Sequence, residues 1–330
     1  MSHHKPRLEE AFFTRRDFLR TSGMGMGALS LGSMLAPTAS AETPLTIPHF
    51  PGKAKRVIHF FCNGGPSHVD TFDPKPALEK YAGKMLPMEN LKTERKTGAA
   101  FPSPFKFKRY GESGIEVSDL FAKTAAHIDD IAVMRSLKAK VPNHEPSLML
   151  MNSGDAVMSR PSMGSWINYG LGSDNQNLPG FVVMCPGGYP VKEADNWRAG
   201  FLPGNFQGTF IDSKHTKIDK LIENIRNSNT TREEQRQQLD LLHAMNEEHA
   251  AKRVNDAHLD AQIKSFELAY RMQMAATDAF DIEKEPEYIH SLYGEGVHAR
   301  QTMIARRLLE RGVRYVQLWH GAGQPWDNHA

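Results

Sequence analysis

The alternation of apolar and polar segments along the chain predicts an α/β fold. Short, nearly continuous apolar runs are typical of parallel strands covered on both faces, and four stand out at residues 55–62, 131–137, 181–185 and 313–319. Helical patterns lie between several of these runs, and a helix predicted over residues 297–311 ends at Gly312. This order predicts a doubly wound parallel sheet, in which ligands bind at the carboxyl ends of the strands.

A long charged segment, residues 218–280, has apolar positions at helical spacing and predicts a helical cap or insertion. It contains His243, His249 and His258, none of which is paired at the i,i+4 spacing that places two metal ligands on one helical face. We therefore interpret these histidines as part of a solvated helical face and expect them not to bind metal.

The first 41 residues have the pattern of an export signal. Arg15 and Arg16 precede a glycine-diluted apolar stretch at residues 21–36, and small residues follow at 39–41. This order predicts a twin-arginine signal that is removed before Glu42, the alternative being an amphipathic surface helix. We therefore expect the twin-arginine export machinery as a partner and a periplasmic or extracellular location. The mature chain has no apolar run of the length that a membrane span needs.

Composition narrows the class of protein. Among 330 residues, 40 Lys and Arg stand against 38 Asp and Glu, and the net charge of +2 argues against a dedicated nucleic-acid binder. The two cysteines, Cys62 and Cys185, lie within apolar runs and are interpreted as small buried hydrophobic residues. Cysteine-based metal sites and disulfide scaffolds are thereby excluded.

The polar segment after the first run is a candidate metal site. It follows Gly64 and Gly65 and contains His68, Asp70 and Asp73, which supply one nitrogen and two carboxylates suited to a divalent metal. The alternative for the two acids is structural, because either could cap a helix that begins near residue 74.

Two more polar segments follow later runs. His144 and Ser147 lie where a nucleophile or metal ligand would meet the N-terminus of a helix, the alternative being a polar cap with a neutral histidine. Asp327 and His329 are two residues apart in a loop and can face one metal. Because loops after neighbouring parallel strands converge, we expect one crevice, with zinc, manganese or a similar ion fitting its nitrogen and oxygen donors.

These segments resemble the exported family known as domain of unknown function 1501, which belongs to the alkaline-phosphatase-like superfamily and is often labelled sulfatase-like. The resemblance is carried by residues 61–75, 160–166, 169–172, 178–183, 200–203 and 326–329. It implies a parallel sheet between helices, one or two divalent metals, and hydrolysis of sulfate or phosphate esters. Asp70, helped by His68, resembles the first metal-binding acidic position, and Asp327 with His329 resembles the later Asp/His pair.

The chain departs from the sulfatase pattern at the nucleophile. In true sulfatases the nucleophile is the first residue of a C/S-x-P-S-R motif, and the same frame here begins with His144 and ends with Leu148. The departure leaves a metal-bound hydroxide as attacking group with His144 as ligand or base, or Ser147 as an unorthodox nucleophile. Family members continue well beyond the Asp/His motif, so we expect a truncated member with an incomplete sheet and metal site.

The function expected from these features is an exported metal-dependent hydrolase. Its substrates would be sulfate or phosphate esters, on small molecules or on polysaccharides. The competing hypothesis is an exported binding or scaffold protein that keeps the fold without catalysis, because the usual nucleophile is missing.

Overall fold

The structure, a computed structural model, describes residues 52–87, 98–222, 230–251 and 257–327. The predicted export signal and His329 lie outside the described residues. The chain divides into two units after residue 53, and everything below concerns residues 54–330.

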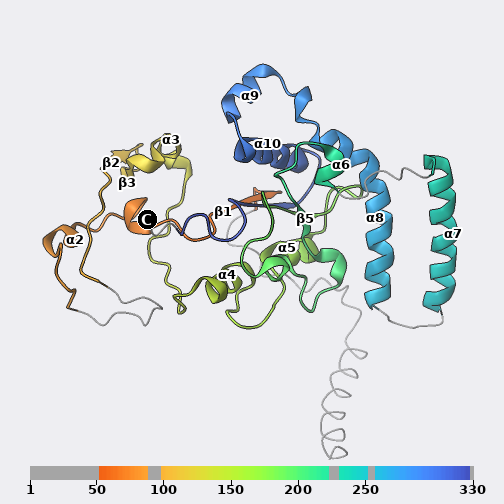
Figure 1. Cartoon of the computed structure of the whole chain (residues 1–330), viewed down its shortest axis with the longest axis horizontal. Helices are drawn as coiled ribbons and strands as arrows, with labels where there is room; N and C mark the ends of the chain where they lie inside the picture. The colour runs from red at the N-terminus through yellow and green to blue at the C-terminus, as the bar shows by residue number, and fades with distance from the viewer. Residues whose placement is uncertain (1–51, 88–97, 223–229, 252–256, 328–330) are drawn as a thin grey trace, which may run out of the picture. The chain divides into compact units, whose positions relative to one another are not determined.

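A parallel sheet forms the centre of this unit (Figure 1). Its strand order is β1-β6-β4-β5, and every neighbouring pair is parallel. The strands are β1 (Val57–Phe61), β4 (Phe181–Met184), β5 (Thr209–Ile211) and β6 (Tyr315–Trp319). The parallel α/β sheet is confirmed, and three of the four predicted runs form strands in it.

Helices cover both faces of the sheet, because successive side chains of each strand point to opposite sides. On one face, Val182, Met184, Val316 and Leu318 pack with α8 (Ala257–Phe280) and α10 (Val297–Glu310). On the other face, Phe181, Val183, Tyr315 and Trp319 pack with α4 (His144–Ser153) and α5 (Met163–Leu171). Burying each such apolar side chain stabilises the fold by about 1.5–3 kcal/mol, so both helical layers are held mainly by this packing.

The remaining elements are short, apart from one long helix. The antiparallel hairpin of β2 (Phe107–Tyr110) and β3 (Ile115–Ser118) has its own small core around Val117 and Ile128. The other elements are η2 (His68–Asp70), α2 (Pro76–Lys80), η3 (Asp119–Phe121), α3 (Ala122–Ala125), η4 (Ile128–Asp130), η5 (Glu193–Trp197), η6 (Gly204–Phe206), α6 (Ile218–Leu221), α7 (Arg232–Ala251), η7 (Ile282–Lys284) and α9 (Glu287–Tyr293).

One predicted strand is wrong. Residues 131–137 form no strand, and Met134 and Leu137 are 70% and 71% exposed. Only Ile131 and Val133 pack, and they do so against the small core of the β2–β3 hairpin. This run is therefore apolar although it is not covered on both faces. The true fourth strand, β5, is too short to stand out in the sequence.

The predicted helix before the last strand is confirmed. α10 ends at Glu310, and Gly312 has a φ of 92°, a left-handed conformation that glycine adopts without a steric penalty. The chain enters β6 directly afterwards. The first turn of α10 therefore lies at the carboxyl edge of the sheet, because helix and strand run in opposite directions.

The segment at residues 218–280 is helical, and its two long helices, α7 and α8, lie side by side (Figure 1). The last turns of α8 contribute Met272, Ala276 and Phe280 to the main core. Buried Arg307 of α10 donates to the carbonyl oxygens at the end of α8, with Nη2 2.8 Å from Asp278 O. None of the described helices is long and apolar enough to cross a membrane.

Both cysteines are free thiols. Cys185 is buried, as predicted, and Cys62 is half-buried. Burial raises the pKa of both thiols, to about 12 for Cys185, where the Asp212 carboxylate adds to the effect. The thiols therefore stay protonated at neutral pH and behave as small apolar side chains.

Candidate functional site

The loops after β1 and β6 are clamped together by Asn63, which is fully buried. Its Nδ2 donates to the carbonyl oxygens of Gly321 and Gly323 at 2.8 and 2.6 Å, and its Oδ1 accepts from the His320 backbone N–H at 3.2 Å. Neighbouring parallel strands bring these loops to one edge of the sheet, and Asn63 then fixes their spacing. This edge, at the carboxyl ends of β1 and β6, is called the strand-end edge below.

Gly64 allows the same two loops to approach closely. A Cβ at this position would lie 2.4 Å from the Asp327 backbone nitrogen, a distance that real contacts essentially never show. Its φ of 101° is also in the left-handed region. The sequence therefore needs glycine here for Asp327 to take its place at the strand-end edge.

His144 and Asp327 meet at this edge. His144 is the first residue of α4, and its Nε2 lies 3.0 Å from Asp327 Oδ2. The side chains are 38% and 24% exposed, so the pair is reached from solvent without being fully hydrated. The second and third of the three predicted loops therefore meet, although His144 and Asp327 are far apart in the chain.

Buried polar side chains hold α4 against the sheet. Gln317 of β6 donates from Nε2 to Asn152 Oδ1 of α4 at 2.7 Å, and Asn152 donates to Asn196 Oδ1 at 3.2 Å. On the neighbouring strand, His59 Nδ1 lies 2.8 Å from the Tyr315 hydroxyl, and burial lowers the pKa of His59. Because unsatisfied buried polar groups are costly, this network fixes the orientation of α4 and hence of its first residue.

Ser147 lies one turn after His144, and its hydroxyl donates to the Val141 carbonyl oxygen at 3.0 Å. A nucleophilic serine must transfer its proton to a base, so this bond would first have to break. The arrangement ties the start of α4 to the preceding loop.

The first predicted loop is arranged differently from the second and third. His68 is exposed and Asp70 half-buried, both within the short turn η2. Asp73 is buried, and its Oδ2 lies 2.7 Å from Lys75 Nζ. Asp73 thus pairs with Lys75, whereas His144 pairs with Asp327.

The capping alternative for Asp73 does not describe the structure. α2 begins at Pro76 with Lys75 as its N-cap, and no side chain caps it. The helix predicted to begin near residue 74 thus begins at Pro76. Pro76 takes that place because its fixed φ suits the first turn and its missing N–H costs nothing there.

Within the described part of the chain, no three His, Cys, Asp or Glu side chains are grouped so as to hold a metal ion. His144 and Asp327 provide two donors in contact. The predicted metal site therefore stays a prediction that depends on further groups, among them His329.

Sequence reasoning missed a histidine pair at the strand-end edge. The rings of His298, from α10, and His320, directly after β6, stack at 4.1 Å with 15° between their planes. Burial lowers the pKa of both, and the charge of His320 lowers that of His298 further. Burial therefore favours the neutral form of both rings. The position of His320 immediately after a predicted strand was the available signal.

A cavity of about 500 Å³ lies beside the edge strand β5. Asp212 at the end of this strand accepts from the Gly187 backbone N–H at 2.8 Å and lies 3.9 Å from His215 Nε2. These residues extend the polar loops to the fourth strand. They too were missed, because β5 was not predicted.

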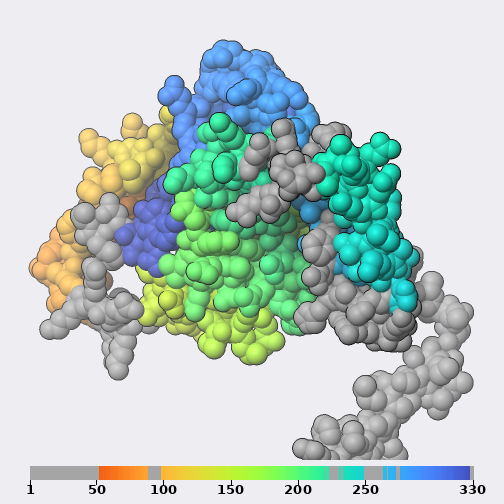
Figure 2. Space-filling model, turned by 45° about the vertical axis from the view of Figure 1, so that its right-hand side comes forward, coloured from red at the N-terminus to blue at the C-terminus, as the bar shows by residue number. Residues whose placement is uncertain are grey.

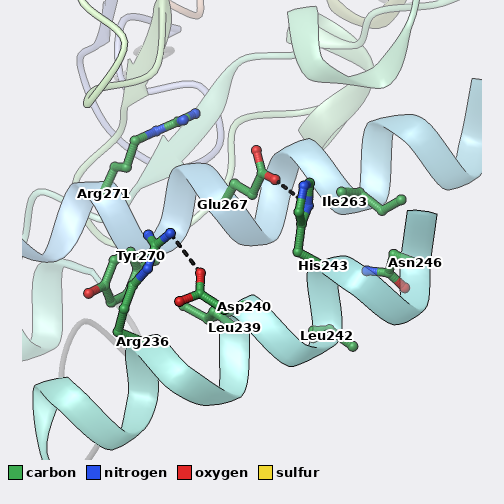
Figure 3. A pocket seen from close by; sticks show the side chains of 10 residues that line it. All are labelled: Arg236, Leu239, Asp240, Leu242, His243, Asn246, Ile263, Glu267, Tyr270 and Arg271. Carbon is green, nitrogen blue, oxygen red and sulfur yellow. Dashed lines mark ion pairs between the residues drawn. The ribbon is translucent and has the colours of Figure 1, made fainter. Parts of the chain in front are cut away.

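The long helices carry a second histidine and acid arrangement. His243 Nδ1 of α7 lies 3.1 Å from a Glu267 carboxylate oxygen of α8 (Figure 3). Its Nε2 lies 3.2 Å from a carboxylate oxygen of Glu247, one turn later on α7. His243 and Glu267 border a cavity of about 230 Å³ between the two helices. The contact with Glu267 links the helices, a role that the predicted solvated face does not include, and the side chains of His249 and His258 lie outside the described ones.

Comparison with known proteins gives one match. A family model described as protein of unknown function (DUF1501) matches residues 54–330. No curated protein and no solved structure matches the chain.

Proposed function

This chain belongs to the DUF1501 family, and we propose that it is an exported hydrolase of sulfate or phosphate esters. The observation that carries the proposal is the contact of His144 with Asp327 at the strand-end edge. In parallel α/β sheets this edge is where ligands bind. A histidine oriented by a carboxylate is the usual arrangement for moving a proton in hydrolysis.

The geometry suggests how the pair would act. An Asp327 carboxylate 3.0 Å from Nε2 favours the tautomer with the proton on that nitrogen, so Nδ1 of His144 is the nitrogen that accepts a proton. Nδ1 would take a proton from the attacking water and return it to the leaving oxygen. Asp327 would stabilise the imidazolium formed between these two steps.

Water is the nucleophile in this proposal. The Ser147 hydroxyl already donates to the Val141 carbonyl oxygen, which argues against its use as a nucleophile. The same observation favours the competing hypothesis of a non-catalytic binding or scaffold protein. The two hypotheses differ in whether any ester is turned over.

A divalent ion, zinc, manganese or similar, remains part of the proposal. In this proposal Asp327 orients His144 and also offers a carboxylate to the ion, and His68, Asp70, Asp73 and His329 are the proposed further ligands. When bound, the ion would supply positive charge to the anionic oxygens of the ester. Elemental analysis of the purified chain tests this: Asp70→Asn should lower metal content, and Asp119→Asn, an exposed acid, should not.

Activity assays test the proposed pair. Purified protein is assayed on p-nitrophenyl sulfate, p-nitrophenyl phosphate and sulfated or phosphorylated sugars, with and without added zinc or manganese. We expect His144→Gln and Asp327→Asn each to lower kcat about a hundredfold, the usual size of an acid–base contribution. The control His127→Gln changes an exposed histidine and should keep full activity.

Two outcomes would contradict this proposal. Wild-type activity in His144→Gln would remove the proposed base. A correctly folded wild-type protein that turns over none of the esters would leave the binding or scaffold function in its place.

Export rests on the sequence alone, since residues 1–41 lie outside the described residues. The twin-arginine machinery recognises the guanidinium pair, so Arg15→Lys with Arg16→Lys should leave an unprocessed precursor in the cytoplasm. Cell fractionation and N-terminal sequencing measure this. Normal processing to Glu42 in the double variant would reject the assignment.

A further inference from the structure

A row of aromatic side chains lies outside the strand-end edge, three of them exposed and one, Phe206, half-buried. Trp166 and Tyr169 of α5 are in edge contact at 6.1 Å, Trp166 contacts Phe201 at 5.6 Å, and Tyr169 contacts Phe206 at 5.3 Å. The green part of the chain that contains α5 and η6 faces solvent over a broad area (Figure 2). These four residues are called the aromatic row below.

The aromatic row is exposed because α5 buries its small and polar residues and presents its large rings to solvent, which is the reverse of an ordinary amphipathic helix. Its buried positions are Gly164, Ser165 and Asn168, whereas Trp166 and Tyr169 are 46% and 53% exposed. A Cβ on Gly164 would lie 2.6 Å from the Phe181 ring, so the small residue lets the helix sit close to the sheet. Large rings left outside in a group mark an interaction surface.

A small polar pocket of about 140 Å³ adjoins this row. Asn168 and Phe206 line it together with the start of β4, where Gly180 and Phe181 lie, and no ionisable side chain lines it. Asn168 is 4% exposed, and its Nδ2 donates to the Gly164 carbonyl oxygen at 2.8 Å. Its Oδ1 has no hydrogen-bond partner in the described part of the chain. This oxygen is itself covered and lies against Gly180, so the polar side chain of the pocket that a ligand can reach is that of Asn205, which is exposed.

We propose that the aromatic row and its pocket bind a neutral polysaccharide chain. Sugar rings offer apolar C–H faces that stack on aromatic rings, and hydroxyl groups that can bond to a polar side chain such as that of Asn205 in the pocket. An uncharged pocket suits a neutral ligand, whereas nucleic-acid binding needs a basic groove beside its stacking rings. A purely apolar protein partner would leave the exposed Asn205 amide at the pocket without a hydrogen-bond partner.

The site is separate from the proposed hydrolase. The pocket lies where β4 begins, at the amino edge of the sheet, and His144 and Asp327 lie at the opposite edge. The aromatic row would therefore anchor the protein to a polysaccharide whether or not it cleaves esters. Loss of binding and loss of activity are then distinguishable in separate variants.

Affinity electrophoresis of the purified chain tests the proposal. Native gels contain xylan, laminarin, galactomannan or hydroxyethylcellulose, and retardation gives the dissociation constant. We expect at least one polysaccharide to retard the wild type, and Trp166→Ala and Tyr169→Ala each to weaken its binding about tenfold. Tyr288→Ala, which removes a 69% exposed ring on α9, is the matched control and should bind as the wild type does. Circular dichroism confirms that each variant is folded.

Salt dependence and oligomeric state complete the test. Because the pocket is uncharged, raising NaCl to about 1 M should leave retardation unchanged. Loss of binding in salt, equal loss in Tyr288→Ala, or no retardation by any polysaccharide would overturn the proposal. So would a wild-type dimer in light scattering that Trp166→Ala converts to a monomer, because a second copy would then cover the aromatic row.

Discussion

Two regions of the molecule pair a histidine with acids, and they are built differently. At the strand-end edge, His144 meets Asp327 because buried Asn63, Gly64 and the polar network under α4 fix the loops around them. On the long helices, His243 meets Glu247 on the next turn of α7 and Glu267 on α8, all through exposed side chains.

The difference separates an organised site from a surface contact. Exposed ion pairs contribute about 0–1 kcal/mol, since long side chains lose entropy and water screens the charges. A pair whose backbone is fixed by buried hydrogen bonds needs no reorganisation before it acts. The proposed chemistry therefore belongs to the strand-end edge, and we expect the contacts between α7 and α8 only to stabilise the fold.

The largest effect on stability is expected when the Asn63 clamp is removed, and this variant tests the comparison most directly. Asn63→Leu leaves two carbonyl oxygens and the His320 N–H without their partner, so we expect the free energy of unfolding to fall by about 3 kcal/mol. Urea unfolding followed by circular dichroism measures it. Asn246→Ala, between the long helices, should change the stability by less than about 0.5 kcal/mol. Equal losses in the two variants would contradict the comparison.

Substitutions at two adjacent glycines sharpen the comparison of the two regions further. Gly64→Ala must accommodate both a left-handed φ and a Cβ 2.4 Å from the Asp327 backbone nitrogen, so it should cost about 2–3 kcal/mol. Gly65→Ala has a φ of 84° but nothing within 4 Å, and should cost about 1 kcal/mol. Thermal unfolding measures the loss of stability in each variant. The difference between the two losses isolates the contact between the loops after β1 and β6. No difference would mean that the loops move apart freely.

The stacked histidines predict a pH dependence. The pKa of His298 and of His320 lies below 6.5 in the folded protein, so the unfolded chain binds protons first as pH falls. Their contribution to stability is present above pH 6.5 and is lost as pH falls through the lowered values. Chemical denaturation between about pH 7.5 and 5 should show stability rising with pH. The double variant His298→Gln, His320→Gln should show a flatter profile, and an unchanged slope would reject this explanation.

The smallest effect is expected on the long helices. His243→Gln removes two exposed ion pairs and should lower the free energy of unfolding by about 0.5 kcal/mol or less. Thermal melting in low and high salt measures it, because salt should erase the difference. A loss above about 2 kcal/mol would show that this region is as tightly organised as the strand-end edge.

Local pattern determined a good part of the fold. Runs covered on both faces predicted β1, β4 and β6, and the glycine at 312 predicted the end of α10, because burial and backbone conformation act over a few residues. The same reasoning failed for residues 131–137, where an apolar run packs on one side only, and it missed β5, which has three residues. Apolar character alone does not say which face is covered.

The partners of the side chains were decided by tertiary structure. The sequence indicated that His144 and Asp327 follow apolar runs, but only the strand order β1-β6-β4-β5 places the first and last strands side by side. That order lets Asn63 bond across 258 positions to Gly321 and brings His298 onto His320. Strand order follows from how helices cover the sheet as a whole, a long-range balance of burial that no short stretch of sequence contains.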